Sequence, residues 1–213
     1  EVVAAVPRKL VLEVPVPPPN LPSNQPFSAA AGGHGQWYDV MGYPEGRKAV
    51  VHAAARLLCE VSAGTTSPFW TYCMSLPPPS ALPPALHPLR REWDLDLQQA
   101  SPVLQRLYVE AKSCNSKCLE NLSRQFPEVS PELRCWALAA VITRNFALKG
   151  ADGKVAALGL LPFLDLFNHC TVETRRSWTC SFQERHGCVV MVADRNISLG
   201  EELTFVYASA PDQ

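Results

Sequence analysis

The sequence predicts an α+β fold, in which small β-sheets carry an inserted block of helices. Three observations lead to this prediction. Residues 1–16 read as two short strands with a turn at Pro7, Arg8 and Lys9, and the middle of the chain shows helical periodicity. The last quarter returns to short strand-like segments separated by turn residues. Strands, then helices, then strands is the order expected of a β-rich domain with a helical insertion.

We therefore expect three parts: an N-terminal β part with a Pro/Gly-rich loop (residues 1–46), a helical insertion (47–140) and a C-terminal β part (141–213). The chain has 213 residues, of which 47% are hydrophobic and 18% charged, enough for one sizeable core. Its 19 Lys and Arg against 20 Asp and Glu leave a net charge of -1 with no basic run, which argues against nucleic-acid binding.

Membrane and secretory signals are not evident in the sequence. No segment has the length and apolarity of a membrane-spanning helix, and the start of the chain lacks a signal-peptide pattern. The eight cysteines are spread along a chain too large to need disulfides, which favours reduced thiols. We expect a soluble intracellular protein, in a cytoplasmic, nuclear or plastid compartment that the sequence does not distinguish.

Three helices are predicted in the middle of the chain. The first covers about residues 47–61, and the second runs from Pro102, capped by Ser101, to Leu122. Along the second helix an apolar stripe predicts the core face, with Leu104, Leu107, Ala111, Cys114, Cys118 and Leu122. The third starts after Ser130 and continues through ELRCWALAAVITRNFAL, apolar nearly all round. The aromatic, proline-broken segment SPFWTYCMSLPPPSALPP is predicted as a connection.

Four strands are predicted in the last quarter, within LGLLPFLD, WTCSF, GCVVMVAD and ELTFVYA. In the last of these, Leu203, Phe205 and Tyr207 alternate with Thr204 and Val206, and so they face opposite sides.

The stretch PFLDLFNHCTVETRR places several chemically active residues beside an apolar run. His169, Cys170, Cys180, His186 and Cys188 are metal-ligand types, but no pair has the C-x2-C spacing of a convincing zinc site. A Cys/His nucleophile pair is weaker still, because neighbours on an extended chain point to opposite sides. Neither alternative is favoured by the residues, and we expect no metal.

Arg144 and Asp165 are more informative, because each charge stands beside apolar sequence. They could form a buried salt bridge between a helix end and a strand, or both could face a polar ligand. Tyr207 reads from composition as an ordinary strand aromatic, and Glu201 and Glu202 as a solvated turn.

Two motifs resemble the SET-domain protein methyltransferases, in the branch of the RuBisCO large-subunit lysine methyltransferase and the actin-histidine methyltransferase. DLFNH (165–169) resembles that branch's D-(L/M)-x-N-H, and GEELTFVY (200–207) resembles G-E-(E/Q)-x-x-(I/F)-x-Y. EVVAAVPRKLVL, SPFWTYCMSLPPPSALP and CWALAAVITRNFAL resemble three further segments of the branch, in the same order.

The resemblance implies a SET fold with a knot-like turn that binds S-adenosyl-L-methionine. Arg144, Asp165, Asn168 and His169 would be the cofactor-binding residues. Thr143, Phe146 and Phe205 would line the channel for the target side chain, and Tyr207 would be the catalytic tyrosine. The sequence begins at the Glu of the branch's G-E-V segment and ends before its Y-G-(F/Y) motif, so we expect it to be truncated at both ends relative to the branch.

The implied activity is S-adenosylmethionine-dependent methylation of a lysine side chain on a non-histone protein substrate. Two alternatives remain open: a catalytically silent SET-like module that binds a partner protein, and a protein-histidine N-methyltransferase. The substrate, the degree of methylation and the oligomeric state are not determined by the residues.

Overall fold

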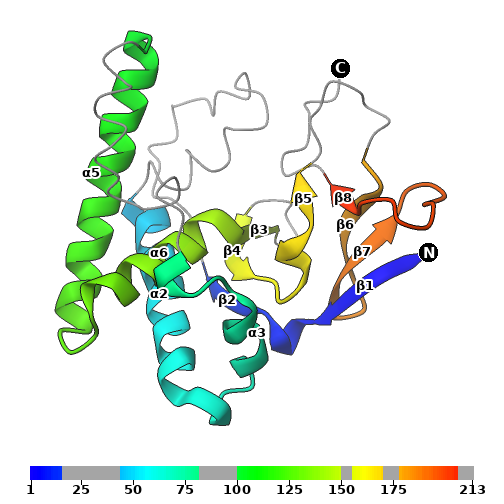
Figure 1. The fold of residues 1–213 in the computed structure, drawn as a ribbon, viewed down its shortest axis with the longest axis horizontal. Helices are drawn as coiled ribbons and strands as arrows, with labels where there is room; N and C mark the ends of the chain where they lie inside the picture. The colour runs from blue at the N-terminus through cyan, green and yellow to red at the C-terminus, as the bar shows by residue number, and fades with distance from the viewer. Residues whose placement is uncertain (16–43, 82–99, 150–154, 170–177, 206–213) are drawn as a thin grey trace.

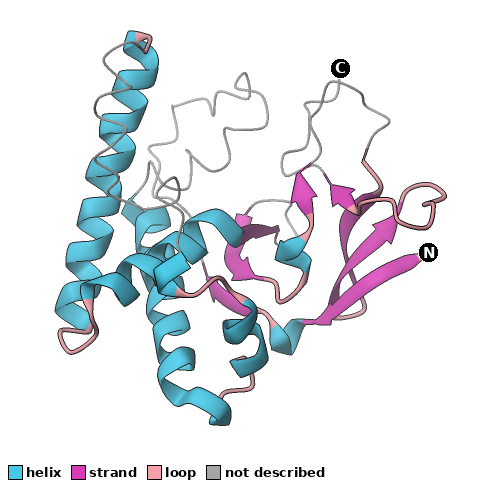
Figure 2. Cartoon of the chain, in the orientation of Figure 1, coloured by secondary structure: helices cyan, strands magenta, loops and turns pink. Residues whose placement is uncertain are grey.

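The computed structural model describes residues 1–15, 44–81, 100–149, 155–169 and 178–205. The helices gather on one side of the molecule and most strands on the other, as Figure 1 shows, with β3 (Asn145–Lys149) and β4 (Val155–Leu160) between them. Figure 2 shows the same division by secondary structure. The arrangement is consistent with the predicted α+β class.

Four helices lie in the described part of the chain: α2 (Pro44–Ala63), α3 (Trp70–Ser75), α5 (Pro102–Gln125) and α6 (Pro131–Arg144). Two begin as the sequence predicts, with a serine cap followed by proline. Leu104 N–H donates to Ser101 Oγ at 3.4 Å, and Leu133 N–H donates to Ser130 Oγ at 3.2 Å. The α2 helix is longer at both ends than the predicted 47–61.

The strands form three small sheets. In the first, β1 (Val2–Pro7), β7 (Cys188–Ala193) and β6 (Cys180–Arg185) are neighbours in that order. In the second, β4 lies between β2 (Leu12–Pro15) and β3, and all pairs in these two sheets are antiparallel. In the third, β5 (Asn168–His169) and β8 (Thr204–Phe205) pair in parallel, with Asn168 opposite Thr204 and His169 opposite Phe205.

The prediction that the third helix continues through Leu148 is wrong. The helix α6 ends at Arg144, and the apolar run goes on as strand β3, which pairs with β4 from Asn145 opposite Leu160 onward. Asn145 has an extended backbone, and its side-chain amide donates to the Val141 carbonyl at 2.6 Å. A run that is apolar on every side suits a buried helix and a buried strand equally, so the pattern could not place this boundary.

Two other segments differ from the sequence predictions, and a third is described only in part. The aromatic connection predicted before the prolines contains the helix α3. The strand predicted within LGLLPFLD ends at Leu160, and residues Leu164–Leu166 form a 3-10 turn. The last predicted strand is described only at Thr204–Phe205, so the predicted faces of Val206 and Tyr207 lie outside the described residues.

Two buried apolar clusters support the molecule. The first packs α2, α3, α5 and α6 against β2 and β4, and includes Tyr72, Leu138 and Val141. The second lies among the strands and includes Leu148, Leu164 and Phe205. Both clusters include strand residues from the start of the chain and from its last third, so segments far apart in the sequence share each core.

The predicted core stripe on α5 is only partly buried. Cys118 and Leu122 are buried at its C-terminal end, whereas Leu104 is 55% exposed near the N-terminus. The stripe prediction is therefore wrong for the N-terminal half of this helix. Helical periodicity shows which side chains share a face, but not how far along the helix a neighbour covers that face.

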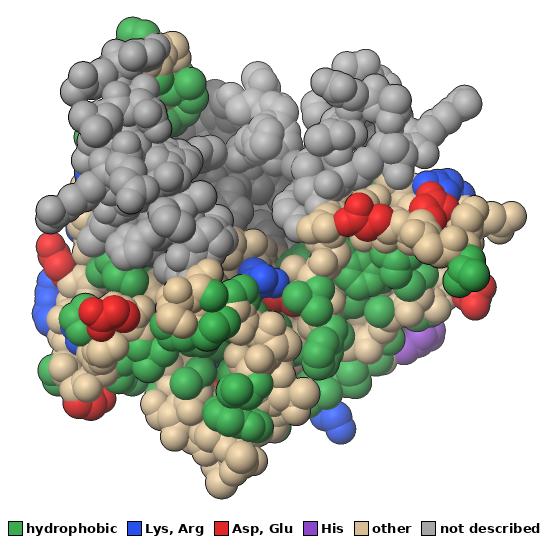
Figure 3. Space-filling model, viewed as in Figure 1, with side chains coloured by type: hydrophobic (Ala, Val, Ile, Leu, Met, Phe, Trp, Pro, Cys, Tyr) green, Lys and Arg blue, Asp and Glu red, His purple; other side chains and the backbone are tan. Residues whose placement is uncertain are grey.

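One face of the molecule shows how charged side chains are distributed over the described surface. On the face drawn in Figure 3, acidic and basic side chains of the described residues are scattered among apolar and neutral ones. Within the described ranges, no helix has both the length and the apolarity needed to span a bilayer.

Candidate functional site

Most of the predicted site residues that the structure describes lie where four segments meet. Arg144 and Phe146 stand on either side of the junction between α6 and β3, and Asp165 lies in the 3-10 turn Leu164–Leu166. Asn168 follows on β5, which pairs with β8, the strand of Phe205. The fold thus brings together residues that are far apart in the sequence.

A tight turn places Asp165 in the interior. The N–H groups of Leu164 and Asp165 both donate to the Leu161 carbonyl, at 3.1 and 3.2 Å. Phe163, just before them, adopts a left-handed backbone with φ 68° while its side chain is half exposed. Such a conformation is costly for a bulky residue and is tolerated where surrounding structure fixes it. Its effect here is to reverse the chain so that Leu164 and Asp165 both point inward.

Asp165 is held by a tyrosine and an arginine. Its side chain is fully buried, and its Oδ2 accepts a hydrogen bond from the Tyr72 hydroxyl at 2.6 Å. Arg144 Nη1 lies 3.6 Å from the same Oδ2 and donates to the Asp165 backbone carbonyl at 3.3 Å. The salt bridge between Arg144 and Asp165, one of the two arrangements that the sequence left open, is therefore present, and Tyr72 is its third member.

The electrostatics of this cluster follow from burial. Desolvation raises the pKa of Asp165, while the Tyr72 hydroxyl and the Arg144 guanidinium act in the opposite direction. Burial, together with the neighbouring Asp165, raises the pKa of Tyr72, so its hydroxyl remains a neutral donor. Asp165 Oδ1 is inaccessible to solvent and has no hydrogen-bond partner among the described residues. One acceptor of a buried carboxyl group is thus left open.

Sequence reasoning missed Tyr72 as a site residue. It was treated only as part of an aromatic connection, although a tyrosine hydroxyl in an apolar segment needs a polar partner when buried. The signal was available on both sides, because Asp165 also stands in apolar sequence and needs a donor. Nothing in the spacing of 93 positions between them indicated that the two would meet.

Three phenylalanines stack beside the junction. The ring of Phe146 lies 5.6 Å from that of Phe182 and 5.7 Å from that of Phe205, measured between centroids, and both pairs are stacked. Phe205 is buried, and Phe146 and Phe182 are half buried. Two residues predicted to line a channel are therefore in contact with each other, and Phe182 joins them from β6.

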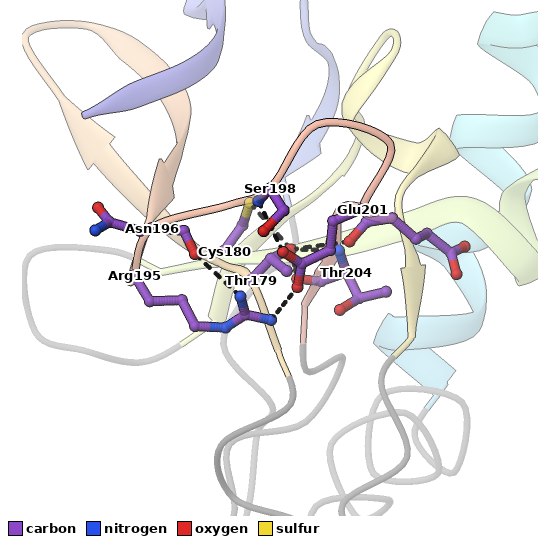
Figure 4. A network of polar contacts seen from close by, with 8 residues as sticks. Thr179, Cys180, Arg195, Asn196, Ser198, Glu201 and Thr204 are labelled. Carbon is purple, nitrogen blue, oxygen red and sulfur yellow. Dashed lines mark hydrogen bonds and ion pairs between the residues drawn. The ribbon is translucent and has the colours of Figure 1, made fainter.

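The glutamates of the GEE segment are more than a solvated turn. The Asn168 side-chain amide donates to Glu202 Oε1, which connects the turn after Asp165 to the segment before β8. Glu201 accepts from the Ser198 N–H at 2.9 Å and pairs with Arg195. The Arg195 guanidinium lowers the pKa of Glu201. These contacts fix the segment that leads into Thr204 and Phe205, and Figure 4 shows Glu201 with Ser198 and Arg195.

Thr179, which lies just before β6, supports β8. Its hydroxyl accepts from the Thr204 N–H at 2.7 Å, and its own N–H donates to the Thr204 carbonyl at 3.1 Å. Figure 4 shows these two residues side by side beneath the loop that carries Ser198 and Glu201. Thr179 is 1% exposed, so water does not replace its hydroxyl.

Replacing Thr179 with valine is expected to lower the free energy of unfolding by about 1–3 kcal/mol, because the Thr204 N–H loses its acceptor in a shielded position. Urea denaturation measures the change. Thr179→Ser keeps the hydroxyl and is the matched control, with less than half of that cost expected. Equal costs for the two variants would show that packing, rather than this hydrogen bond, supports β8.

Three predicted site residues are placed less directly. Thr143 is exposed, and its hydroxyl donates to the Ala139 carbonyl of its own helix at 2.8 Å. The side chain of His169 and the whole of Tyr207 lie outside the described residues. No group of three or more His, Cys, Asp or Glu side chains that could hold a metal ion occurs in the described ranges.

The family follows from comparison with known proteins. The model of the SET domain matches residues 39–208, which is most of the chain. The chain therefore belongs to the SET domain family, whose members are in general protein methyltransferases that act on protein substrates and use S-adenosylmethionine. A search of curated proteins finds no match to the sequence.

Proposed function

We propose that the intact protein carrying this chain transfers a methyl group from S-adenosylmethionine to a lysine side chain of a non-histone protein. The observation that carries the proposal is the junction at which Arg144, Asp165 and Asn168 come together inside the SET match. A buried charged pair in otherwise apolar surroundings, with an exposed amide three residues further along the chain, favours a ligand site over a purely structural role.

The motifs favour one branch of the family. DLFNH and GEELTFVY resemble the branch of the RuBisCO large-subunit lysine methyltransferase, and the two segments lie on the paired strands β5 and β8 and just before them. We propose that this parallel pair is part of a knot-like cofactor turn. We also propose that residues 1–46 and 141–213 form the SET part, and that residues 47–140 are its helical insertion.

The residues present suit the cofactor chemically. Arg144 uses Nη1 for Asp165, and in the described structure its Nε and Nη2 have no partner, while its side chain is 22% exposed. A guanidinium with free N–H groups suits the carboxylate of the methionine part. The exposed Asn168 side chain suits a polar group of the ligand. When bound, S-adenosylmethionine supplies a methyl group activated on a sulfonium.

The other site residues would act on the target side chain. Methyl transfer requires a neutral amine, and a lysine in water has a pKa of about 10.4, so an environment that disfavours the charged form helps. The stacked Phe146 and Phe205 would exclude water from the amine, and the Tyr207 hydroxyl would accept contacts from the polarised methyl group. The main task of the protein is then alignment of the reacting atoms.

Transfer of labelled methyl from S-adenosylmethionine to lysate proteins tests this function. The intact protein is incubated with cofactor and lysate, and the labelled product is hydrolysed to amino acids. Label in methyl-lysine is the expected result. Label in methyl-histidine would show that the target residue is histidine rather than lysine. The absence of any labelled protein would favour a catalytically silent module that only binds a partner protein.

A further inference from the structure

Tyr72 connects two parts of the molecule that otherwise have separate apolar cores. It belongs to the core of the helices, whereas Leu164, the neighbour of Asp165, belongs to the core of the strands. The 2.6 Å hydrogen bond from the Tyr72 hydroxyl to Asp165 Oδ2 crosses between them. Tyr72 is 2% exposed, so the bond forms in a dry setting where it is strong.

The contacts form a chain from α3 through the turn to the end of α6. The Tyr72 hydroxyl donates a hydrogen bond to Asp165 Oδ2. The Arg144 guanidinium forms an ion pair with the same Oδ2 and donates a hydrogen bond to the Asp165 backbone carbonyl. Arg144 is the one member of the three with an exposed part. A change at Tyr72 therefore reaches a ligand only through the orientation of Asp165 and Arg144.

We propose that Tyr72 is a positioning residue of the cofactor site: its hydroxyl holds the Asp165 carboxylate, which holds the Arg144 guanidinium ready to bind a ligand carboxylate. This inference rests on the proposed function and adds a residue that does not touch the cofactor itself.

A pH dependence follows from the geometry. Among the described residues, Tyr72 of α3 and Arg144 of α6 are the titratable or charged groups that face Asp165. Oδ2 is occupied by both, so a proton taken up by Asp165 would bind at the open Oδ1 and remove the charge that holds Arg144. Without the Tyr72 hydroxyl, the pKa of Asp165 rises further, because a donor that stabilises the ionised form is lost.

Calorimetric titration of the intact protein with S-adenosylmethionine between about pH 5 and pH 8 tests the proposal. Tyr72→Phe is expected to weaken binding roughly tenfold near neutral pH, because a hydrogen bond to a charged group is lost. Its affinity should also begin to fall at a higher pH than that of the wild type. Tyr108→Phe makes the same chemical change on α5 and should leave both quantities unchanged.

A second measurement needs no cofactor. The cost of Tyr72→Phe in unfolding free energy should be larger near neutral pH than near pH 4, because the lost bond matters most when Asp165 is ionised. Asp165→Asn cannot ionise, and in that background the pH dependence of the cost should disappear. Because these measurements compare unfolding free energies, they test the positioning role even if Tyr72→Phe is less stable than the wild type.

The outcomes separate this inference from the proposed function. Binding by the wild type with an unchanged affinity and pH profile in Tyr72→Phe would overturn the positioning role alone. A cost of Tyr72→Phe that is the same at both pH values would do so as well. No binding by the folded wild type would overturn the proposed function, and the positioning role with it.

Discussion

Replacing Arg144 with methionine is expected to lower the free energy of unfolding by about 3 kcal/mol at neutral pH, because it leaves a buried carboxylate without its counter-charge. The Asp165 side chain is fully buried, and the Arg144 guanidinium is the one cationic group among the described residues that contacts it. Methionine keeps much of the length and apolar contact of the arginine stem. The loss of unfolding free energy should therefore come from the missing charge rather than from a change in side-chain volume.

The pH dependence of this loss has a definite sign. Burial already raises the pKa of Asp165, and removal of Arg144 raises it further. The penalty arises from the ionised carboxylate, so it is largest at neutral pH and shrinks as the pH falls and Asp165 takes up a proton. Urea denaturation at neutral pH and near pH 4 measures both values.

Two further variants sharpen this test. Arg124→Met breaks an exposed pair with Glu120 on α5, at 3.8 Å, and should cost less than about 0.5 kcal/mol. Arg144→Met combined with Asp165→Asn should recover more than half of the loss, because no charge remains buried. If the two substitutions lower the unfolding free energy additively, the Arg144–Asp165 ion pair does not explain the loss seen in Arg144→Met.

If Tyr207 has the catalytic role proposed for it, replacing it with phenylalanine is expected to slow methyl transfer about 100-fold, because a hydroxyl that orients the transferring methyl would be removed and small misalignments carry that cost. Tyr207 lies outside the described residues, and the proposed role rests on the resemblance of GEELTFVY to the SET motif. Affinity for S-adenosylmethionine should change little, since the role is exerted in the transition state.

Single-turnover transfer of labelled methyl by the intact protein measures this effect. Tyr108→Phe removes a tyrosine hydroxyl from α5 and is the matched control, with a rate equal to that of the wild type expected. A Tyr207→Phe variant that transfers methyl at the wild-type rate would assign the catalytic contact to another residue. Loss of cofactor binding together with rate would instead assign Tyr207 to the binding site.

The local parts of the fold were predictable from the sequence. Ser101 and Ser130, each followed by proline, mark the starts of α5 and α6, because a serine cap and a proline in the first turn act within a few residues. The boundary at Asn145 was not predictable, since it depends on β4 offering backbone partners to a run that suits either structure.

The site was predictable only where one residue carries its own signal. Arg144 and Asp165 each stand out as charges in apolar sequence, and the structure pairs them. The hydroxyl of Tyr72 indicates that it needs a polar partner if it is buried, but not which partner, and the ring of Phe182 carries no signal at all. Their roles follow from how α3 and β6 pack, which no local pattern contains.

Calorimetric titration of the intact, folded protein with S-adenosylmethionine at neutral pH tests the proposed cofactor site most directly. We expect saturable binding at one site per chain, weakened when Asn168 is replaced by alanine and unchanged when the exposed Arg124 is replaced by methionine. Absence of any saturable heat from the folded wild-type protein would contradict the proposed cofactor site.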